Sequence, residues 1–371
     1  MSILDTLRQT AILNGTDPDE DETIKLLSGL RDGTWLDAQE FPPLRWHLPG
    51  IIPEGSNLLV GPPKVGKSWF VLALALAVAS GGRMLGETVE SRPVLYLALE
   101  DGDRRLQDRC RTLLEGEAIP EGFTYLTRIE PGSVLATIDA WLDCHPDTSP
   151  LVILDTLGKV MPPALMGESS YGRDYRVGSA LKRLVDHHPG SALLVNHHDR
   201  KAQSEDFVER VSGTNGLAGA ADTIIVLARD RHADEGTIAV TGRDVGEGEY
   251  AVRFDGTTGT WSTQGRTLAD AAARAAQQRA ASGIGDRSAE IVTYVAEHPD
   301  GVRAREVATT FEMGDKAAGT YLGRLADAGR IQRASRGLYT PVGSVELLET
   351  KVLDFPQLNT SNTPTGGPDA S

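Results

Sequence analysis

The stretch Asn57-Leu58-Leu59-Val60-Gly61-Pro62-Pro63-Lys64-Val65-Gly66-Lys67-Ser68 leads directly into the apolar run Phe70–Ala79. Its last eight residues fit the pattern G-x-x-x-x-G-K-S, in which glycines let backbone N–H groups close around phosphate oxygens. The pattern requires a strand before it and a helix after it, and the two apolar runs supply both. The stretch therefore predicts a phosphate-binding loop between a buried strand and a buried helix.

The residue types in this loop indicate what it binds. The Lys67 ammonium would reach the β- and γ-phosphates of a nucleotide, and the Ser68 hydroxyl would be a ligand for Mg²⁺. The N-terminus of the following helix adds a partial positive charge. We therefore expect ATP and Mg²⁺ as cofactors, held by Gly61, Pro62, Pro63, Lys64, Val65, Gly66, Lys67 and Ser68. An ordinary Gly/Pro turn before a buried helix is the alternative, and the flanking runs disfavour it.

Two other strand-like runs end in acids. Leu151–Leu154 leads into Asp155, and Val94–Leu99 leads into Glu100. A carboxylate is needed beside the Mg²⁺ of such a site, and a second one can activate the attacking water. We expect Asp155 to serve the metal and Glu100 to act as the general base. The alternatives are a turn-capping role for Asp155 and, for Glu100 with its neighbour, capping of a helix that begins near Asp103.

The wider pattern predicts the fold class. Between Ile51 and about Asp255, short apolar runs alternate with helical stretches, which is typical of βαβ units that form a mostly parallel sheet. The expected fold is therefore α/β, with a sheet flanked by helices. Further strands are expected at Ala192–Val195 and Thr223–Leu227, and a hairpin at Gly236–Thr241 and Tyr250–Phe254.

Together, the loop, Glu100 and Asp155 resemble RecA-type ATPases, and more narrowly the RepA/DnaB-like hexameric helicase group, often labelled AAA family ATPases. The resemblance covers residues 43–255. In that group the catalytic glutamate ends the strand after the loop helix, as Glu100 does here. The end of the next predicted strand, Asn196-His197-His198-Asp199, looks like the group's His-His sensor motif. The resemblance therefore implies that His197, with His198 as the second candidate, senses the γ-phosphate.

The resemblance also implies contacts with DNA and with neighbouring subunits. Residues 207–222 are similar to a loop that faces the central channel of the group's rings, so Arg200, Lys201 and Arg210 become candidate DNA contacts. A solvated, charged loop is the alternative. Arg243 lies where ring helicases present an arginine finger to a neighbouring subunit's ATP. DnaB-like proteins have a lysine at the position of Thr241, so coupling between subunits would be built differently here.

A second module is expected after an Ala/Arg/Gln-rich helical linker. Helical patterns at Ser288–His298, Arg303–Thr310 and Lys316–Ala328 precede a basic strand-turn-strand, which predicts a small C-terminal winged-helix domain. Its candidate DNA contacts are Lys316, Arg324, Arg333 and Arg336, which belong to a locally basic segment that also contains Arg330. Docking of a partner protein or of another subunit is the alternative role.

These patterns divide the chain into five segments. We expect a lead-in over residues 1–42, a RecA-like ATPase domain over 43–262 and a helical linker over 263–285. The winged-helix-like domain would follow over 286–342, and a largely disordered tail over 343–371.

Composition narrows the function further. A net charge of −15 and a pI near 5.0 argue against a protein that coats nucleic acid, so any DNA contact must be local. The longest apolar run is too short to span a bilayer, and residues 1–5 lack a secretory pattern, so we expect no membrane contact and a cytoplasmic location. Cys110 and Cys144 are too few for a disulfide framework or a zinc site and are expected to be reduced.

The leading hypothesis is a hexameric, homo-oligomeric ATPase motor on single-stranded DNA, such as a replicative helicase of a phage, plasmid or mobile element. One alternative is a RecA-like recombination or repair ATPase, or a factor that loads a helicase. Another is a winged-helix DNA-binding regulator that ATP switches on or off. Replication or recombination proteins are the expected partners in the first two cases.

Overall fold

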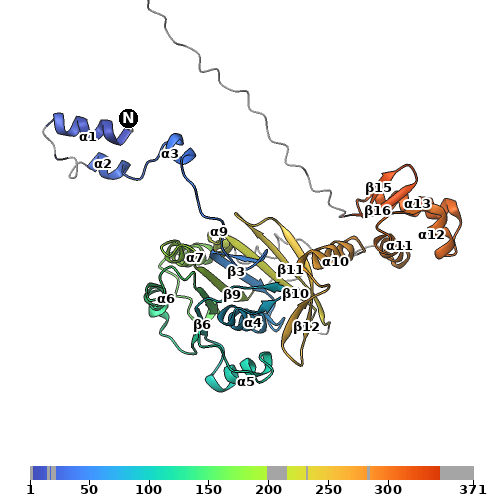
Figure 1. Ribbon diagram of the computed structural model, residues 1–371, viewed down its shortest axis with the longest axis horizontal. Coiled ribbons are helices and arrows are strands. Elements are labelled where there is room, and N and C mark those ends of the chain that lie inside the picture. Colours follow the sequence, from blue (N-terminus) through green and yellow to red (C-terminus); the bar gives the residue numbers. More distant parts are fainter. Residues whose placement is uncertain are drawn as a thin grey trace, which may run out of the picture. The chain divides into compact units, whose positions relative to one another are not determined.

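A computed structural model of the chain describes residues 3–14, 17, 22–198, 215–230, 233–281 and 285–342. Within this part of the chain, the main feature is a nine-stranded sheet in the order β13-β12-β11-β10-β3-β9-β8-β6-β7 (Figure 1). Six neighbouring strands run parallel: β10 (Thr223–Arg229), β3 (Gly55–Gly61), β9 (Ala192–His198), β8 (Leu151–Asp155), β6 (Val94–Ala98) and β7 (Phe123–Leu126). Three antiparallel strands extend the sheet: β11 (Glu235–Gly242), β12 (Gly248–Asp255) and β13 (Thr260–Thr263).

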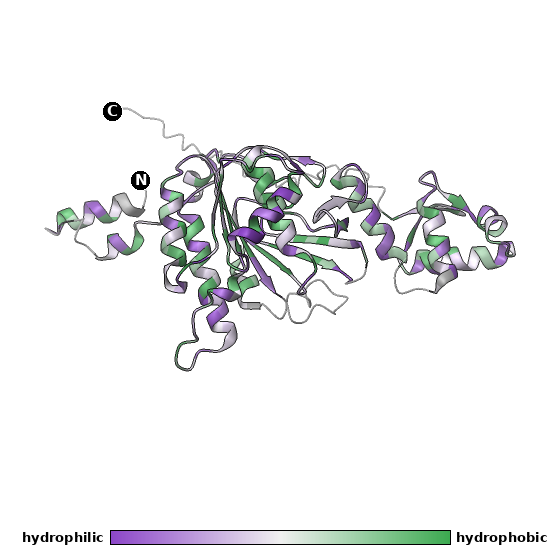
Figure 2. Cartoon of the chain, turned by 90° about the horizontal axis from the view of Figure 1, so that it is seen from below, coloured by the Kyte–Doolittle hydropathy of each residue, from purple (hydrophilic) through white to green (hydrophobic). Residues whose placement is uncertain are grey.

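The central strands are apolar along their whole length because both faces of the sheet are covered. Successive residues of a strand point to opposite faces. Accordingly, Leu59 and Leu194 belong to one buried cluster, whereas Leu58 and Val195 belong to the other. Figure 2 shows these strands in green between the flanking helices.

Helices cover the two faces separately. One face carries α4 (Lys67–Ser80) and α5 (Asp103–Leu113), and the other carries α6 (Val134–Asp143), α7 (Ser170–Asp186) and α9 (Asn215–Ala220). The α/β class with a mostly parallel sheet flanked by helices is therefore confirmed. The smaller elements are β1 (Trp46–Leu48), β2 (Ile52–Pro53), β4 (Arg83–Met84), β5 (Glu87–Thr88) and two 3₁₀ turns, Pro131–Ser133 and Leu157–Lys159.

Residues 1–45 form a compact unit of their own. It contains α1 (Ile3–Leu13), α2 (Glu22–Leu27) and α3 (Gly33–Asp37). The Asp32 carboxylate caps α3 by accepting a hydrogen bond of 2.8 Å from the backbone N–H of Trp35. No residue of α3 is buried, so this helix depends on its cap more than on a core.

The C-terminal part begins with α10 (Leu268–Ala281), the expected linker helix, which packs on β12. After it come α11 (Asp286–Ala296), α12 (Ala304–Thr310) and α13 (Asp315–Asp327), each within two residues of its predicted bounds. A small sheet follows in the order β14-β16-β15, made of Val302–Arg303, Leu338–Pro341 and Ile331–Ser335.

These helices and strands share a separate core that includes Ile291, Val307 and Leu322. The order of elements is the one that a winged helix has, and that assignment stays a prediction. Residues 343–371, the predicted tail, lie outside the described residues. None of the described helices combines the length and the apolarity that crossing a bilayer requires.

Candidate active site

The carboxyl ends of four neighbouring parallel strands meet at one edge of the sheet. In the register of the sheet, Gly61 lies beside His198, and Asp155 lies between Asn196 and Ala98. Open α/β sheets bind their ligands at this edge. Because Glu100 follows β6 by two residues, it reaches the same edge as the phosphate loop.

The loop has the backbone conformation that its glycines predict. Gly66 has a φ of +110°, in the region that favours glycine, and it is the N-cap residue directly before α4. Gly61 allows a close approach, since a Cβ there would lie 2.4 Å from the carbonyl oxygen of Leu227 on β10. The N–H groups at the start of α4 thus face the edge where the strands end.

The Lys67 side chain is buried at this edge, with only 3% of the residue exposed. Its Nζ donates hydrogen bonds to the carbonyl oxygens of Gly61, at 2.7 Å, and Pro62, at 3.0 Å. The same Nζ lies 3.0 Å from Nδ1 of His198. Lys67 therefore connects the loop to the end of β9.

Asp155 is the centre of a buried hydrogen-bond network. Its Oδ1 accepts bonds from Ser68 Oγ at 3.3 Å and from Asn196 Nδ2 at 2.5 Å, and its Oδ2 accepts one from Tyr96 at 2.7 Å. Burial raises the pKa of the Asp155 carboxyl, and the hydrogen bonds from Tyr96, Ser68 and Asn196 act in the opposite direction by favouring the carboxylate. Burial also raises the pKa of Tyr96 well above its ordinary value, so its hydroxyl stays a donor.

Ser68 and Asp155 fit a magnesium site. Mg²⁺ prefers oxygen ligands and is commonly bound by one or two protein oxygens together with substrate phosphates. The Ser68 hydroxyl and the Asp155 carboxylate are adjacent at the mouth of the loop, where nucleotide phosphates would complete the ligand set.

Glu100 lies at the open side of this network. Its Oε1 is 3.4 Å from Nε2 of His198, and 34% of its side chain is exposed. Gly102 begins α5 without a side-chain cap, so neither Glu100 nor Asp101 has the capping role considered above. Asp101 instead pairs with Arg105 and Arg109. Glu100 is thus left facing the edge where a nucleotide would lie.

The structure distinguishes the two histidines. His198 contacts both Lys67 and Glu100, whereas His197 precedes it on the strand and is directed to the other face of the sheet. The sequence placed the sensor at His197 first. The geometry brings His198, the second candidate, to the site, and the sensor role of either residue stays a prediction.

Arg243 lies far from the loop of its own subunit. It follows β11, and its guanidinium is 58% exposed and 3.1 Å from the Asp222 carboxylate. Asp222 precedes β10, at the amino end of the parallel strands, because Thr223 pairs with Asn57 at the start of β3. That edge is separated from the phosphate loop by the length of β3, about 20 Å at 3.3 Å per residue. Arg243 therefore cannot reach a nucleotide in the loop of its own chain, and its role as a finger toward a second copy stays a prediction.

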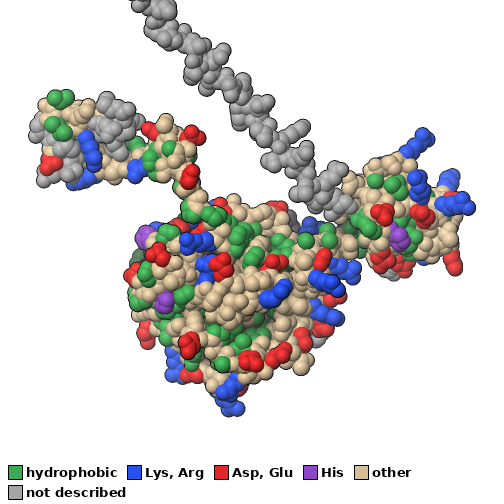
Figure 3. Space-filling view, in the orientation of Figure 1, with side chains coloured by type: hydrophobic (Ala, Val, Ile, Leu, Met, Phe, Trp, Pro, Cys, Tyr) green, Lys and Arg blue, Asp and Glu red, His purple; other side chains and the backbone are tan. Residues whose placement is uncertain are grey.

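The predicted DNA contacts fall into two groups. Arg200, Lys201 and Arg210 lie outside the described residues. The four on the C-terminal module, Lys316, Arg324, Arg333 and Arg336, are all exposed, and Figure 3 shows the basic side chains of that module in blue. Arg333 is 3.0 Å from Asp327, and Arg330 donates to the carbonyl of Arg279 at the end of α10.

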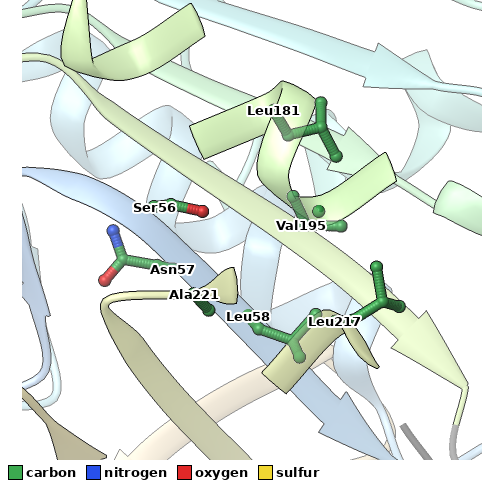
Figure 4. A pocket seen from close by; sticks show the side chains of 8 residues that line it. Ser56, Asn57, Leu58, Leu181, Val195, Leu217 and Ala221 are labelled. Atoms are coloured by element: carbon green, nitrogen blue, oxygen red, sulfur yellow. The ribbon is translucent and has the colours of Figure 1, made fainter. Parts of the chain in front are cut away.

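The cavity in Figure 4 is not part of this site. It has a volume of about 10 Å³ and lies between β3, β9, α7 and α9, lined mainly by Leu58, Gly178, Leu181, Val195 and Leu217. A space of that size holds at most a water molecule. It is a packing defect of the core beneath α7.

A protein-family model described as an AAA domain matches residues 20–204. No curated protein sequence matches the chain. A solved ATPase domain is 14% identical, with a TM-score of 0.46, over 57% of this chain and 85% of that domain. A DnaB-like replicative helicase is 15% identical, with a TM-score of 0.46, over 56% of this chain and 57% of its own. A KaiC-like protein from Pyrococcus horikoshii is 14% identical, with a TM-score of 0.42, over 60% of this chain and 100% of its own.

The family match includes the phosphate loop, Glu100, Asp155 and His198. The sheet brings those same residues to one edge, with the loop between the central strand β3 and α4. The motif, the fold and the match to an AAA domain therefore agree in supporting a P-loop ATPase domain of the RecA type.

Proposed function

We propose that the chain is an ATP-hydrolysing motor that works on single-stranded DNA as a ring of identical subunits. A replicative helicase of a phage, plasmid or mobile element is the specific form that we favour. The observation that carries the proposal is the chain of contacts from Lys67 through His198 to Glu100. It joins the phosphate loop, the proposed general base and the end of β9, after which Arg200 and Lys201 follow in the sequence.

Each side chain at the sheet edge has a separate role in ATP hydrolysis. Lys67 neutralises charge on the β- and γ-phosphates, and the loop N–H groups orient them. Glu100 holds a water at the γ-phosphorus and accepts its proton. When bound by Ser68 and Asp155, Mg²⁺ supplies further neutralisation of phosphate charge.

His198 can report which nucleotide is bound. Its Nδ1 accepts a hydrogen bond from Lys67, so the ring proton is on Nε2, which faces Glu100. A γ-phosphate draws the Lys67 ammonium toward its own oxygens, and Nδ1 then loses its donor. The His198 ring is then released at one nitrogen, at the end of β9, two residues before Arg200 in the sequence.

A turnover assay tests the motor against the ATP-switched regulator. We expect ATPase activity that single-stranded DNA stimulates, and a loss of about 10²–10⁴-fold in Glu100→Gln with nucleotide binding retained. Lys67→Ala, the control, should lose binding and turnover together. A slow rate that is unaffected by DNA and by Glu100→Gln would instead favour the regulator.

Two further measurements separate a ring helicase from a recombinase or a helicase loader. Electron microscopy with an ATP analogue should show closed rings, whereas open helical filaments would favour the recombinase. On a forked DNA substrate, the wild-type protein should separate the strands with ATP and Mg²⁺. DNA-stimulated hydrolysis without any unwinding would favour the loader.

A further inference from the structure

Two side chains from other strands hydrogen-bond to the backbone of the phosphate loop, one from β13 at the antiparallel end of the sheet and one from β10 beside β3. Trp261 on β13 donates a hydrogen bond of 3.1 Å from its indole Nε1 to the carbonyl oxygen of Gly66. Arg229, at the end of β10, donates one of 3.2 Å from Nε to the carbonyl oxygen of Val65. These are consecutive carbonyl groups of the loop, and their partners lie more than 160 residues away in the sequence.

One edge of the Trp261 indole lies close to Gly66. A Cβ on Gly66 would lie 3.0 Å from Cζ2 of the indole and 3.2 Å from its Nε1. Any side chain at this position would push the tryptophan away. Glycine at position 66 is therefore required by the indole as well as by its own φ of +110°.

The two donors are themselves fixed in place. Trp261 is only 4% exposed, and its ring lies 5.0 Å from that of Phe254, its register partner on β12. The Arg229 guanidinium lies 4.7 Å from the centre of the Phe254 ring and also donates to the carbonyl of Ala233 at 2.6 Å. Phe254 thus supports both donors, so the loop meets a rigid surface.

The geometry of the peptide unit links these bonds to phosphate binding. In a trans peptide, the C=O of one residue and the N–H of the next lie in one plane and point in opposite directions. The Gly66 carbonyl also accepts backbone N–H bonds from Trp69 and Phe70 in the first turn of α4, and Trp261 adds a bond from outside the helix. Holding the carbonyls of Val65 and Gly66 in this way turns the N–H groups of Gly66 and Lys67 to the opposite side of the loop. N–H groups at these positions are the donors that a phosphate needs.

We propose that Trp261, with Arg229 beside it, is a positioning residue that presets the N–H groups of the phosphate loop for a nucleotide. This inference rests on the nucleotide site of the proposed function. It adds a role for the antiparallel part of the sheet, whose strands supply both Trp261 and Phe254.

Trp261→Phe is the variant to test, because it keeps an aromatic ring and removes only the donor. We expect ADP to bind about fivefold more weakly, the effect of losing one neutral hydrogen bond, while the rate at saturating ATP stays close to that of the wild type. ADP binding should also change the tryptophan fluorescence of the wild type, and most of that change should disappear in Trp261→Phe. Trp141→Phe, the same substitution on α6, should retain both the affinity and the signal.

The outcomes separate this inference from the proposed function. If the wild type binds no ADP, the nucleotide site itself is wrong. If the wild type binds ADP and folded Trp261→Phe binds it equally well with an unchanged fluorescence response, the positioning role is overturned. If Trp261→Phe does not fold, Arg229→Met decides, since it removes the donor to Val65 and keeps an unbranched side chain. Unchanged ADP affinity in that variant also overturns the role.

Discussion

Replacing Tyr96 with phenylalanine should weaken magnesium binding without weakening the nucleotide site itself. The Tyr96 hydroxyl is fully buried and donates to Asp155 Oδ2 at 2.7 Å, which leaves Oδ1 directed at Ser68. The phenyl ring that packs against Phe123 is kept in the variant, so the change removes one oxygen and one bond. A hydrogen bond to a charged group contributes about 1.5–3 kcal/mol.

The magnitude follows from what remains around Asp155. Asn196 and Ser68 still hold Oδ1, so the carboxylate keeps two of its three donors and loses only the one that fixes its rotation. Removing a partner that orients a metal ligand typically costs 10–100-fold in metal affinity. Because two donors persist, we expect the lower end, about tenfold, which corresponds to about 1.4 kcal/mol.

The assay is a titration of ADP affinity against Mg²⁺ concentration. The midpoint should move to about tenfold higher Mg²⁺ in Tyr96→Phe, whereas affinity measured in excess chelator should equal that of the wild type. Tyr125→Phe is the matched control, because Tyr125 pairs with Tyr96 in the sheet but is 43% exposed. A wild-type midpoint in Tyr96→Phe would refute the positioning of Asp155 by this hydroxyl.

Three other predictions address charge, assembly and DNA. Burial raises the pKa of Asp155 above its ordinary 3.8. Between 3.8 and the raised pKa, the folded state therefore holds a proton that the unfolded state has lost. Without a cation, the free energy of unfolding should fall as pH rises through this range. Asp155→Asn should remove this dependence, and an identical pH–stability curve would contradict the assignment. Arg243→Ala should bind ATP without turnover, and mixing it with Lys67→Ala should restore part of the activity; mixed assemblies without any recovery would argue against a finger in trans. Lys316→Ala with Arg324→Ala should weaken binding to DNA at all sequences and reduce the slope of log affinity against log salt by about 1–2, and an unchanged slope would remove the module from the DNA interface.

The sequence was sufficient for the parts of the site that have local signals. The phosphate loop carries its own glycines and lysine, and the acids Glu100 and Asp155 each follow an unbroken apolar run. Parallel strands buried on both faces produce such runs, so the position of an acid directly after one predicts where it lies in space. Composition and helical patterns, which are also local signals, predicted the linker helix and the helices of the C-terminal module.

The parts that were not predicted depend on contacts between distant residues. Tyr96 lies within an apolar run, which predicts a core residue. Its hydroxyl nevertheless donates to Asp155 on the neighbouring strand β8. Choosing His198 over His197 requires knowing which residues of β9 face the phosphate loop. Two adjacent histidines do not show this in the sequence. Trp261 contacts the loop because β13 is the last strand of the antiparallel part of the sheet. Neither β13 nor β7 was predicted as a strand.

The N-terminal segment shows a different limit. The expected lead-in contains three helices that we did not predict: α2 and α3 have only six and five residues, whereas α1 has 11 and is as long as α11. The acidic residues Asp17, Asp19, Glu20, Asp21 and Glu22 stand directly before and at the start of α2 and obscure its pattern, and α3 is identified mainly by its Asp32 cap. Local caps and short helices are weak signals beside a buried strand.

The proposed function depends on Lys67 and the loop around it holding a nucleoside triphosphate with magnesium. Calorimetric titration of the wild-type protein and of Lys67→Ala with a non-hydrolysable ATP analogue and Mg²⁺ tests it most directly. We expect one saturable site per chain in the wild type and no detectable binding in the variant. Absence of binding in the wild type, or equal binding in both proteins, would contradict it.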